Sequence, residues 1–354
     1  MPNRRILIIG PSWVGDMVMA QTLFKVLRQR HPGCEIDVLA PQWSKPLLDR
    51  MPEVRSGLSM PVGHGQLQLG TRRTIGRELR EAGYDQAIVL PNSLKSALIP
   101  FFAGIPQRTG WRGEMRYGLL NDVRKLNKSD YPLMIERFVA LALSQGADLP
   151  EPIPRPALTV DQKAAAKLLA EKGLQSPVLA LCPGAEFGPA KRWPDKHYAA
   201  VAAEYIGRGW QVVLMGSAKD AEVAERIRAA LPPTSAERCI SLCGKTSLGQ
   251  AIDILSQVSA VVSNDSGLMH ISAALGRPLV VVYGSTSPGF TPPLAERVAI
   301  EQIPVDCGPC FKRECPLGHL KCLVDLAPVR VIQSLDALLA DEPIAVELSG
   351  KDNS

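Results

Sequence analysis

The stretch Arg4-Arg-Ile-Leu-Ile-Ile-Gly-Pro-Ser-Trp-Val-Gly-Asp-Met17 decides the fold class of this chain. Its apolar residues 6–9 predict a short buried strand, and the two glycines that follow predict a turn. Apolar residues then recur at helical spacing from Met17 to Leu27, until His31-Pro-Gly33 ends the pattern. A buried strand that enters a helix through a glycine turn is the first unit of a doubly wound α/β sheet.

The same alternation of strand and helix patterns continues along the chain. Further strands are expected at residues 36–40, 87–90, 178–181, 211–215, 260–263 and 279–283. Helices are expected at residues 72–82, 94–103, 196–207, 221–231 and 268–275. Strands that alternate with helices predict parallel sheets built from βαβ units.

A proline-rich segment divides the chain. Four prolines fall within residues 150–156, which predicts a stiff extended connector. With 354 residues, at about 150 residues per domain, we predict two Rossmann-like domains, residues 1–160 and 161–354. A C-terminal helix at about residues 327–342 is expected to pack back on the first domain.

The two halves also resemble each other faintly. A strand, Asn92-Ser93, a helix and Gly104-Ile-Pro106 in the first half correspond to a strand, Asn264-Asp265, a helix and Gly276-Arg-Pro278 in the second. Similar units in both halves favour two doubly wound domains that face each other, with a ligand in the cleft at the carboxyl ends of the strands.

Composition and charge exclude several classes of protein. With 46% hydrophobic and 21% charged residues the chain is globular, and no apolar run approaches the roughly 18 residues of a membrane span. The apolar run near the N-terminus is too short for a signal peptide, so we expect a cytoplasmic protein whose eight cysteines are reduced. Residues 1–160 hold 21 basic and 14 acidic residues, a balance of +7, against −2 for the rest. Either an anionic partner or a solvated basic face accounts for this excess.

The first candidate site is the turn that ends in Asp16. The turn is not the dinucleotide fingerprint G-x-G-x-x-G, because Pro11, Ser12 and Asp16 give it a bulky loop that ends in a carboxylate. A pyrophosphate at this helix start would be repelled by Asp16. Two interpretations of Asp16 remain open: a helix cap, or a general base that points into the cleft.

Two loops of the second half look suited to a phosphorylated ligand. In the loop 182–194, Gly184 and Lys191 precede a helix start, which favours a phosphate loop over an ordinary surface turn. In Asn264-Asp-Ser-Gly-Leu-Met-His270, the amides around Ser266 and Gly267 point out of a helix start, while Asp265 is placed for sugar hydroxyls. A helix cap with His270 in the core is the alternative. Asp220 heads a helix where ribose-binding acids tend to sit.

Four cysteines form a separate cluster. Cys307-x2-Cys310-x4-Cys315-x6-Cys322 has spacing close to that of a zinc knuckle, and four thiolates can close a tetrahedral site. A structural zinc, reduced thiols and a regulatory disulfide are the three interpretations. No catalytic role is assigned to these residues.

With these motifs in order, the chain resembles the ADP-heptose:lipopolysaccharide heptosyltransferases of glycosyltransferase family 9. The resemblance extends to about residue 295 and rests on the turn at 10–17, the two loops of the second half and two further runs. These runs are Leu90-Pro-Asn-Ser-Leu-Lys-Ser-Ala97, continued by Pro100-Phe-Phe-Ala-Gly-Ile-Pro106, and Arg108-Thr-Gly-Trp-Arg-Gly-Glu-Met-Arg-Tyr-Gly-Leu-Leu-Asn-Asp122.

The resemblance implies a GT-B architecture and an inverting transfer of L-glycero-D-manno-heptose from ADP-heptose. The implied acceptor is the first heptose of heptosyl-Kdo2-lipid A, and a sibling enzyme acting on a neighbouring core position is the alternative. The resemblance also implies contact with the cytoplasmic face of the inner membrane. We expect neither a catalytic cofactor nor a nucleic-acid partner.

The resemblance also implies roles for individual residues. Asp16 aligns with the general base, and the donor-binding positions are Gly184, Lys191, Asp220, Asp265, Ser266, Gly267 and His270. The basic first half is expected to receive Kdo carboxylates and core phosphates through Lys95, Arg108, Arg112, Arg116 and Arg137.

These roles are physically consistent. In an inverting displacement the base and the phosphate binders belong on opposite cleft walls, and Asp16 and Lys191 fall in different predicted domains. The chain holds no Asp-x-Asp pair for a divalent ion, so a lysine and helix amides would meet the charge of the leaving diphosphate. An NAD-dependent dehydrogenase and a nucleic-acid-binding protein are the rival functions.

Overall fold

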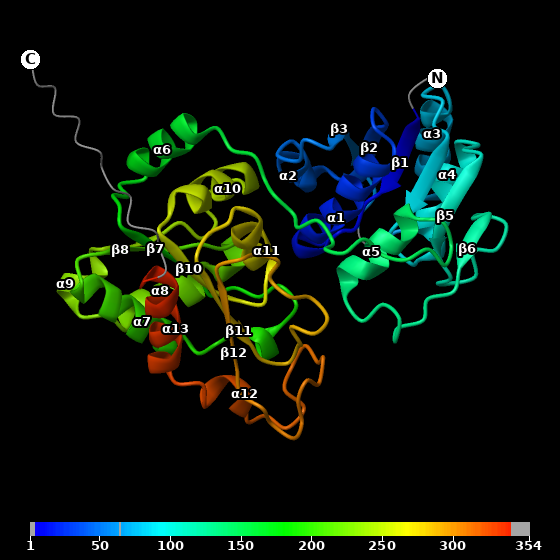
Figure 1. Ribbon diagram of the computed structural model, residues 1–354. Coiled ribbons are helices and arrows are strands. Elements are labelled where there is room, and N and C mark those ends of the chain that lie inside the picture. Colours follow the sequence, from blue (N-terminus) through cyan, green and yellow to red (C-terminus); the bar gives the residue numbers. More distant parts are fainter. Residues whose placement is uncertain (1–3, 64, 341–354) are drawn as a thin grey trace, which may run out of the picture.

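The fold consists of two α/β lobes, each with its own parallel sheet (Figure 1). The computed structural model describes residues 4–63 and 65–340. Over these residues the strands form two six-stranded sheets in which all strands run parallel, as the strand and helix alternation predicts. None of the described helices has the length and apolar character needed to span a membrane.

The first lobe holds the sheet ordered β3-β2-β1-β4-β5-β6. Its strands are β1 (Arg5–Ile9), β2 (Glu35–Pro41), β3 (Val54–Met60), β4 (Gln86–Val89), β5 (Gln107–Trp111) and β6 (Asp122–Arg124). The helices of this lobe are α1 (Val14–Arg30), α2 (Lys45–Leu48), α3 (Leu69–Arg80), α4 (Leu98–Phe102) and α5 (Met134–Ala142), with short 3-10 turns at η1 (Gln42–Ser44) and η2 (Leu94–Ala97).

The second lobe holds the sheet ordered β12-β11-β10-β7-β8-β9. Its strands are β7 (Val178–Cys182), β8 (Gln211–Leu214), β9 (Cys239–Ser241), β10 (Ala260–Asn264), β11 (Leu279–Tyr283) and β12 (Val298–Gln302). Its helices are α6 (Gln162–Glu171), α7 (Asp195–Gly207), α8 (Ala221–Ala229), α9 (Pro233–Ala236), α10 (Leu248–Gln257), α11 (Gly267–Ala274), α12 (Lys321–Val324) and α13 (Pro328–Ala340), with 3-10 turns at η3 (Pro189–Lys191) and η4 (Ala218–Asp220).

Both sheets have the same doubly wound topology. When the strands of the second sheet are counted from its own first strand, the two orders become identical, and each reverses beside its first strand. The strands β4 and β10 occupy equivalent places in their sheets. Asn92-Ser93 follows β4, while Asn264 is the last residue of β10 and Asp265 comes directly after it. The faint sequence similarity therefore falls on topologically equivalent units.

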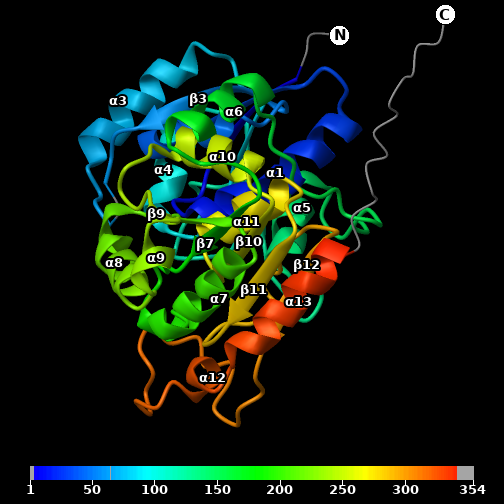
Figure 2. The same ribbon diagram turned by 90° about the vertical axis from the view of Figure 1, so that its left-hand side faces the viewer.

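The lobes meet through helices α1 and α11. Every residue of β1 after Arg5 is buried, and α1 covers it with the apolar residues that the sequence pattern identifies, among them Met17 and Leu23. The helix α1 packs against both α5 and α11, so a single apolar cluster extends from the first lobe into the second. Figure 2 shows α1 and α11 in the middle of the molecule.

The proline-rich connector is fastened to the first lobe. The buried side chain of Gln21 donates from Nε2 to the carbonyl of Ala157 (2.8 Å) and accepts the N–H of Ala157 through Oε1 (2.9 Å). Farther along, Arg50 of the first lobe forms an ion pair with Asp253 of α10 (2.6 Å). The exact domain boundary near residue 160 stays a prediction.

The C-terminal helix departs from the sequence-based expectation. Over its described part, α13 packs against α7, β11 and β12 of the second lobe rather than back on the first. The reason is its apolar face, because Val331 and Leu335 are fully buried in the core of the second lobe. Residues 341 and 342 of the predicted range lie outside the described residues.

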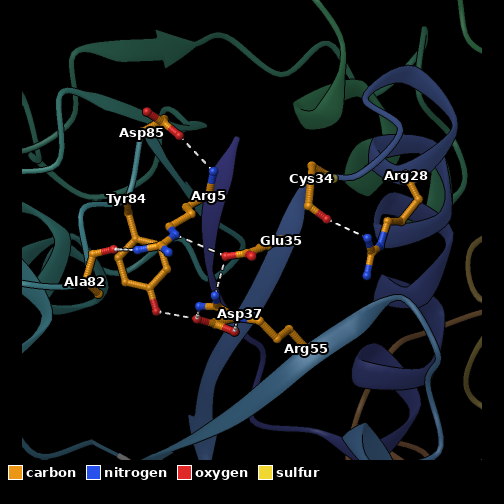
Figure 3. A network of polar contacts seen from close by, with 9 residues as sticks. All are labelled: Arg5, Arg28, Cys34, Glu35, Asp37, Arg55, Ala82, Tyr84 and Asp85. Carbon is orange, nitrogen blue, oxygen red and sulfur yellow. Dashed lines mark hydrogen bonds and ion pairs between the residues drawn. The ribbon is translucent and has the colours of Figure 1, made fainter. Parts of the chain in front are cut away.

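Charged side chains crosslink the amino-terminal edge of the first sheet (Figure 3). Asp37, in β2, is only 2% exposed, and its carboxylate accepts hydrogen bonds from Arg55 of β3 (2.9 Å) and from the hydroxyl of Tyr84 (2.6 Å). Glu35 joins the network through Arg5 of β1 (3.0 Å) and through Arg55. This edge is a structural network, because its buried charge is fully paired.

Candidate active site between the two lobes

A cavity of about 700 Å³ lies between the lobes, at the carboxyl ends of the strands. The first lobe contributes the turn from Ser12 to Asp16, together with Trp43 of η1. The second lobe contributes the predicted loops around Lys191 and Asp265. The expected cleft is therefore present, and its lining residues fall within two separate parts of the sequence, 12–43 and 182–291.

Asp16 occupies the first turn of α1 without capping it. The N-cap position belongs to Trp13, and the helix start has no side-chain cap hydrogen bond. Asp16 is thus three residues into the helix, partly buried, and lines the cavity. The cap interpretation of Asp16 is wrong, and the interpretation as a reacting group remains.

The start of α11 faces the start of α1. A Cβ atom on Gly15 would lie 2.6 Å from Cδ2 of His270, and a Cβ atom on Gly267 would lie 2.8 Å from Cβ of Val14. Both glycines are therefore needed so that the two helix starts can approach each other across the lobes. Burial lowers the pKa of His270 to about 4, so this side chain is a neutral imidazole packed behind Gly15.

The α11 start carries the amides expected to face an anion. Ser266 is its N-cap residue, and its hydroxyl oxygen accepts the N–H of Met269 (3.4 Å). Ser266, Gly267 and His270 all line the cavity. The positive end of a helix dipole therefore points into the same space as Asp16.

Lys191 and Asp265 form an ion pair inside this cavity. The Nζ atom of Lys191 donates to Oδ2 of Asp265 (2.6 Å), and Thr286 Oγ1 donates to the same oxygen (2.6 Å). Asp265 lines the cavity although it is only 4% exposed, and its role toward sugar hydroxyls stays a prediction. Its Oδ2 atom is occupied by protein donors, one of which is the predicted phosphate-binding lysine.

Asn264 fixes the loop that carries Lys191. Its Oδ1 atom accepts the backbone N–H of Trp193 (3.1 Å) and the hydroxyl of Tyr198 (3.0 Å), while its Nδ2 atom donates to the carbonyl of Pro183 (2.7 Å). One buried amide thereby holds both ends of the loop against the end of β10. The sequence contains this asparagine in the quoted motif, but its role depends on three partners far away in the chain.

Asp220 and Gly184 differ in part from their predicted roles. Asp220 lines the cavity, but its Oδ2 atom accepts the backbone N–H of Ser217 (2.9 Å) and the Ser217 hydroxyl (2.8 Å) in a capping box. A Cβ atom on Gly184 would lie 2.5 Å from the Asp220 carboxyl carbon. The absence of a side chain at residue 184 therefore makes room for Asp220, and not only for a ligand.

The electrostatics of the cavity favour a base at Asp16. Burial is the largest effect and raises the pKa of Asp16 to about 6, while Lys191 lowers this pKa and Asp265 raises it. A carboxyl group with this pKa is mostly ionised at pH 7, yet it binds a proton more readily than an ordinary aspartate. Such a group is suited to accept a proton from a hydroxyl.

The five basic residues predicted for the acceptor lie outside this cavity, and three of them serve the protein itself. Arg116 is 1% exposed and donates to the carbonyls of Pro91 (2.7 Å) and Trp111, so its prediction as a ligand-binding residue is wrong. A buried guanidinium that satisfies backbone carbonyls positions a loop.

The other four basic residues divide evenly. Arg108 donates to the carbonyls of Leu119 and Ile105, and Arg137 donates to the carbonyl of Tyr131 and stacks over the ring of Phe290. Lys95 is half-buried, and Arg112 is exposed. All four stay predictions as acceptor-binding residues, although Arg108 and Arg137 already have partners in the protein.

Several cavity residues escaped the sequence analysis. Trp13 and Trp43 are two aromatic side chains from the first lobe, and Thr246, Ser247 and Leu248 form the start of α10. The capping box of Ser247 with Gln250 was a readable signal for that helix start. The two tryptophans could have been predicted only from their positions, since each follows a strand that ends at the cavity.

The cysteine cluster lies beside the cavity rather than in it. All eight cysteines of the chain are free, and Cys307, Cys310, Cys315 and Cys322 line one small hollow. Within residues 4–63 and 65–340, no three Cys, His, Asp or Glu side chains stand together in an arrangement that could hold a metal ion.

Comparison with known proteins identifies relatives of this fold and site. The family model described as glycosyltransferase family 9 (heptosyltransferase) matches residues 72–321. The chain is 52% identical to lipopolysaccharide heptosyltransferase 2 of Escherichia coli (strain K12), over 96% of this chain and 99% of that protein. It is 51% identical to lipooligosaccharide heptosyltransferase 2 of Haemophilus influenzae, over 95% and 99% of the respective chains. The solved E. coli ADP-heptose lps heptosyltransferase II superimposes with a TM-score of 0.87 at 50% identity, covering 95% and 98%, which confirms the predicted GT-B fold class.

Proposed function

Because this chain belongs to glycosyltransferase family 9, the heptosyltransferases, we propose that it transfers L-glycero-D-manno-heptose from ADP-heptose to the first heptose of a heptosyl-Kdo2-lipid A acceptor. Family membership makes the chain a glycosyltransferase of lipopolysaccharide inner-core assembly. The rival dehydrogenase and nucleic-acid-binding functions have no support from these relatives. The proposal adds the donor, the acceptor position and the residues that carry the reaction.

The observation that carries the proposal is the position of Asp16. Asp16 lines one cavity with Lys191 and with the start of α11, and burial raises its pKa to about 6. We assign Asp16 as the general base that takes the proton of the acceptor hydroxyl. The hydroxyl oxygen then bonds to the anomeric carbon as the bond from that carbon to the diphosphate breaks, and ADP leaves with the electron pair.

The second lobe is assigned to the donor. Negative charge grows on the diphosphate oxygen as its bond breaks, and Lys191 with the amides of Ser266 and Gly267 is suited to stabilise that charge. Lys191 would exchange its contact with Asp265 for the phosphate, which leaves Asp265 near the sugar. In this scheme the lysine and the helix start supply the positive charge, and no divalent ion takes part.

The first lobe is assigned to the acceptor and to the membrane surface. Arg112 and Lys95 remain to receive core phosphates and Kdo carboxylates. Arg112 begins a loop whose Met115 and Tyr117 are 82% and 66% exposed, and the buried Arg116 holds that loop in place. A loop with two exposed large side chains fits peripheral contact with a membrane, which for this acceptor is the cytoplasmic face of the inner membrane.

The test is a transfer assay with a series of acceptors. The protein is incubated with ADP-heptose and with lipid A acceptors truncated at successive core sugars, and the products are identified by mass. We expect one added heptose only on the acceptor that ends in the first heptose, and none from the Asp16→Asn variant, which should still bind ADP. The exposed carboxylate Asp49 provides a matched control, since Asp49→Asn should retain the wild-type rate. Transfer to another acceptor would overturn the assigned core position, and an active Asp16→Asn variant would overturn the assigned base.

A further inference from the structure

We propose that Cys307, Cys310, Cys315 and Cys322 bind one Zn²⁺ ion through four thiolates, and that the segment clamped by this metal holds the donor loop in position. The proposal rests on the proposed function only in treating residues 187–191 as the donor loop. The metal site itself is argued from the cysteines, and the coupling from contacts between the two segments.

The four cysteines surround one hollow of ionic size. Residues from β12 to α12 form no regular structure between Ile303 and Leu320, yet all four cysteines from this stretch and from the start of α12 line the same cavity of about 20 Å³. A cavity of this size holds roughly one water molecule or one ion. The sulfur atoms do not yet stand in coordination geometry, so a bound metal would draw them together.

The middle of the segment has no regular structure and leaves large apolar side chains unpacked. A loop of this length without secondary structure is uncommon, and its large apolar side chains Phe311 and Leu317 are exposed rather than packed in a core. Small apolar-poor units of this kind are stabilised by a crosslink or a metal. Because all eight cysteines are free, the crosslink we assign here is a metal.

The donor set is best completed by sulfur rather than by His319. The Nδ1 atom of His319 accepts the backbone N–H of Lys321 (3.0 Å), so this nitrogen already has a partner in the protein. Four thiols that bind Zn²⁺ release four protons and leave a site of charge −2.

The segment between Cys310 and Cys315 is bonded directly to the donor loop. The carbonyl of Arg313 accepts the N–H of Ala190 (3.0 Å), and its Nε donates to the carbonyl of Phe187 (2.6 Å). A Cβ atom on Gly188 would lie 2.4 Å from the Arg313 carbonyl oxygen, so this contact needs a glycine.

The same contact reaches the predicted phosphate lysine. The guanidinium of Arg313 and the Nζ atom of Lys191 both lie near the ring of Phe187, at 5.7 Å and 5.0 Å from its centroid. Phe311 also donates its N–H to the carbonyl of Ser285 (2.7 Å), beside Thr286. Movement of the cysteine segment would therefore disturb the loop from which Lys191 reaches Asp265.

The metal is tested by analysis of the purified full-length protein. After dialysis against a weak chelator, we expect about one zinc per chain by elemental mass spectrometry, and its loss in the Cys310→Ser/Cys315→Ser double variant. Cys34→Ser removes a buried cysteine of the first lobe and should keep the zinc. A metal-free protein with four reactive thiols, or one with a disulfide among these cysteines, would overturn the site. One equivalent of iron would overturn the choice of zinc and support the tetrathiolate site.

The coupling is tested by ADP binding, measured by calorimetry. We expect the double variant to bind ADP about tenfold more weakly, and Arg313→Ala to weaken ADP binding while it keeps its zinc. Removal of zinc from the wild-type protein with a strong chelator, and addition of zinc alone afterwards, should lower and restore the affinity. Unchanged ADP affinity in all three experiments would overturn the coupling. Neither measurement needs heptose transfer, so failure of the proposed reaction would be seen separately in the transfer assay.

Discussion

Asp37 and Asp16 are aspartates of the same lobe that lie at opposite edges of its sheet. Asp37, near the amino-terminal edge, is buried with Arg55 and the Tyr84 hydroxyl as partners. Asp16, at the carboxyl edge, faces a cavity, and burial raises its pKa to about 6. One edge pairs its buried charge and gains stability, while the other keeps a carboxylate in an unfavourable setting that makes it a better base. The predictions below test this division.

Removal of each carboxylate in turn is the sharpest test, and the largest effect is expected at Asp16. Asp16→Asn removes the base and should lower the transfer rate by about 10²–10⁴-fold. The melting temperature should stay the same or rise, because a desolvated charge is lost. Transfer kinetics and thermal unfolding of the same preparation measure both. A variant that melts early would place Asp16 among the structural charges, with Asp37.

The close contacts at the carboxyl edge of the sheet can also be disrupted by substitution of a glycine. Gly15→Ala would place a methyl group against the buried ring of His270, and overpacking of this kind costs about 2–3 kcal/mol. We expect lower stability and weaker ADP binding, since the two helix starts must separate. Gly70→Ala in α3 is the matched control, because a Cβ atom there meets nothing within 4 Å. Unfolding in urea and ADP titration measure the two effects, and equal behaviour of the two variants would contradict the role of this contact.

A smaller loss is expected at the amino-terminal edge. Asp37→Ala leaves the buried Tyr84 hydroxyl without its acceptor, which costs about 1–2 kcal/mol; the half-exposed Arg55 is resolvated by water. The transfer rate per folded molecule should not change. Urea unfolding at constant pH measures the loss, with Tyr84→Phe as a second variant that removes the same hydrogen bond. A changed rate in the Asp37 variant would show that the two edges are coupled.

The contrast between the edges also explains which features were predictable from sequence. Strand β11 is fully buried and β1 is buried after Arg5, so their apolar runs predicted them. The turns at Asp16 and Ser266 followed because a strand and the next helix are adjacent in sequence. By contrast, β3 (Val54–Met60) includes Arg55, two serines and a glycine, so its residue pattern does not predict a strand. It forms a strand because it pairs with β2. Local patterns thus predict units, and pairing partners decide the rest.

Roles that depend on distant partners were the ones that sequence reasoning assigned wrongly or missed. From the sequence alone Arg116 is interpreted as a free cation, because its carbonyl partners are not visible there. Asn264 is likewise interpreted as a turn residue, because its partners Trp193 and Pro183 are far away in the chain. The C-terminal helix has an apolar face that fits either lobe in principle, and only the core around Val331 decides between them.

The smallest expected effect is the dependence of the rate on pH, which separates the roles of the two aspartates. Asp16 must be ionised to accept a proton, and its pKa is raised to about 6, so activity should be complete above that pH and lost below it. At pH 5 the value of kcat/KM should be about tenfold lower, with a slope of one proton. Because Lys191 lowers the pKa of Asp16, Lys191→Met should move the midpoint of the profile upward, even though its rate is lower throughout. Asp37→Asn should leave the midpoint unchanged, since that carboxylate belongs to the other edge. A midpoint that is unchanged in Lys191→Met and shifted in Asp37→Asn would reverse the assignment of the two edges.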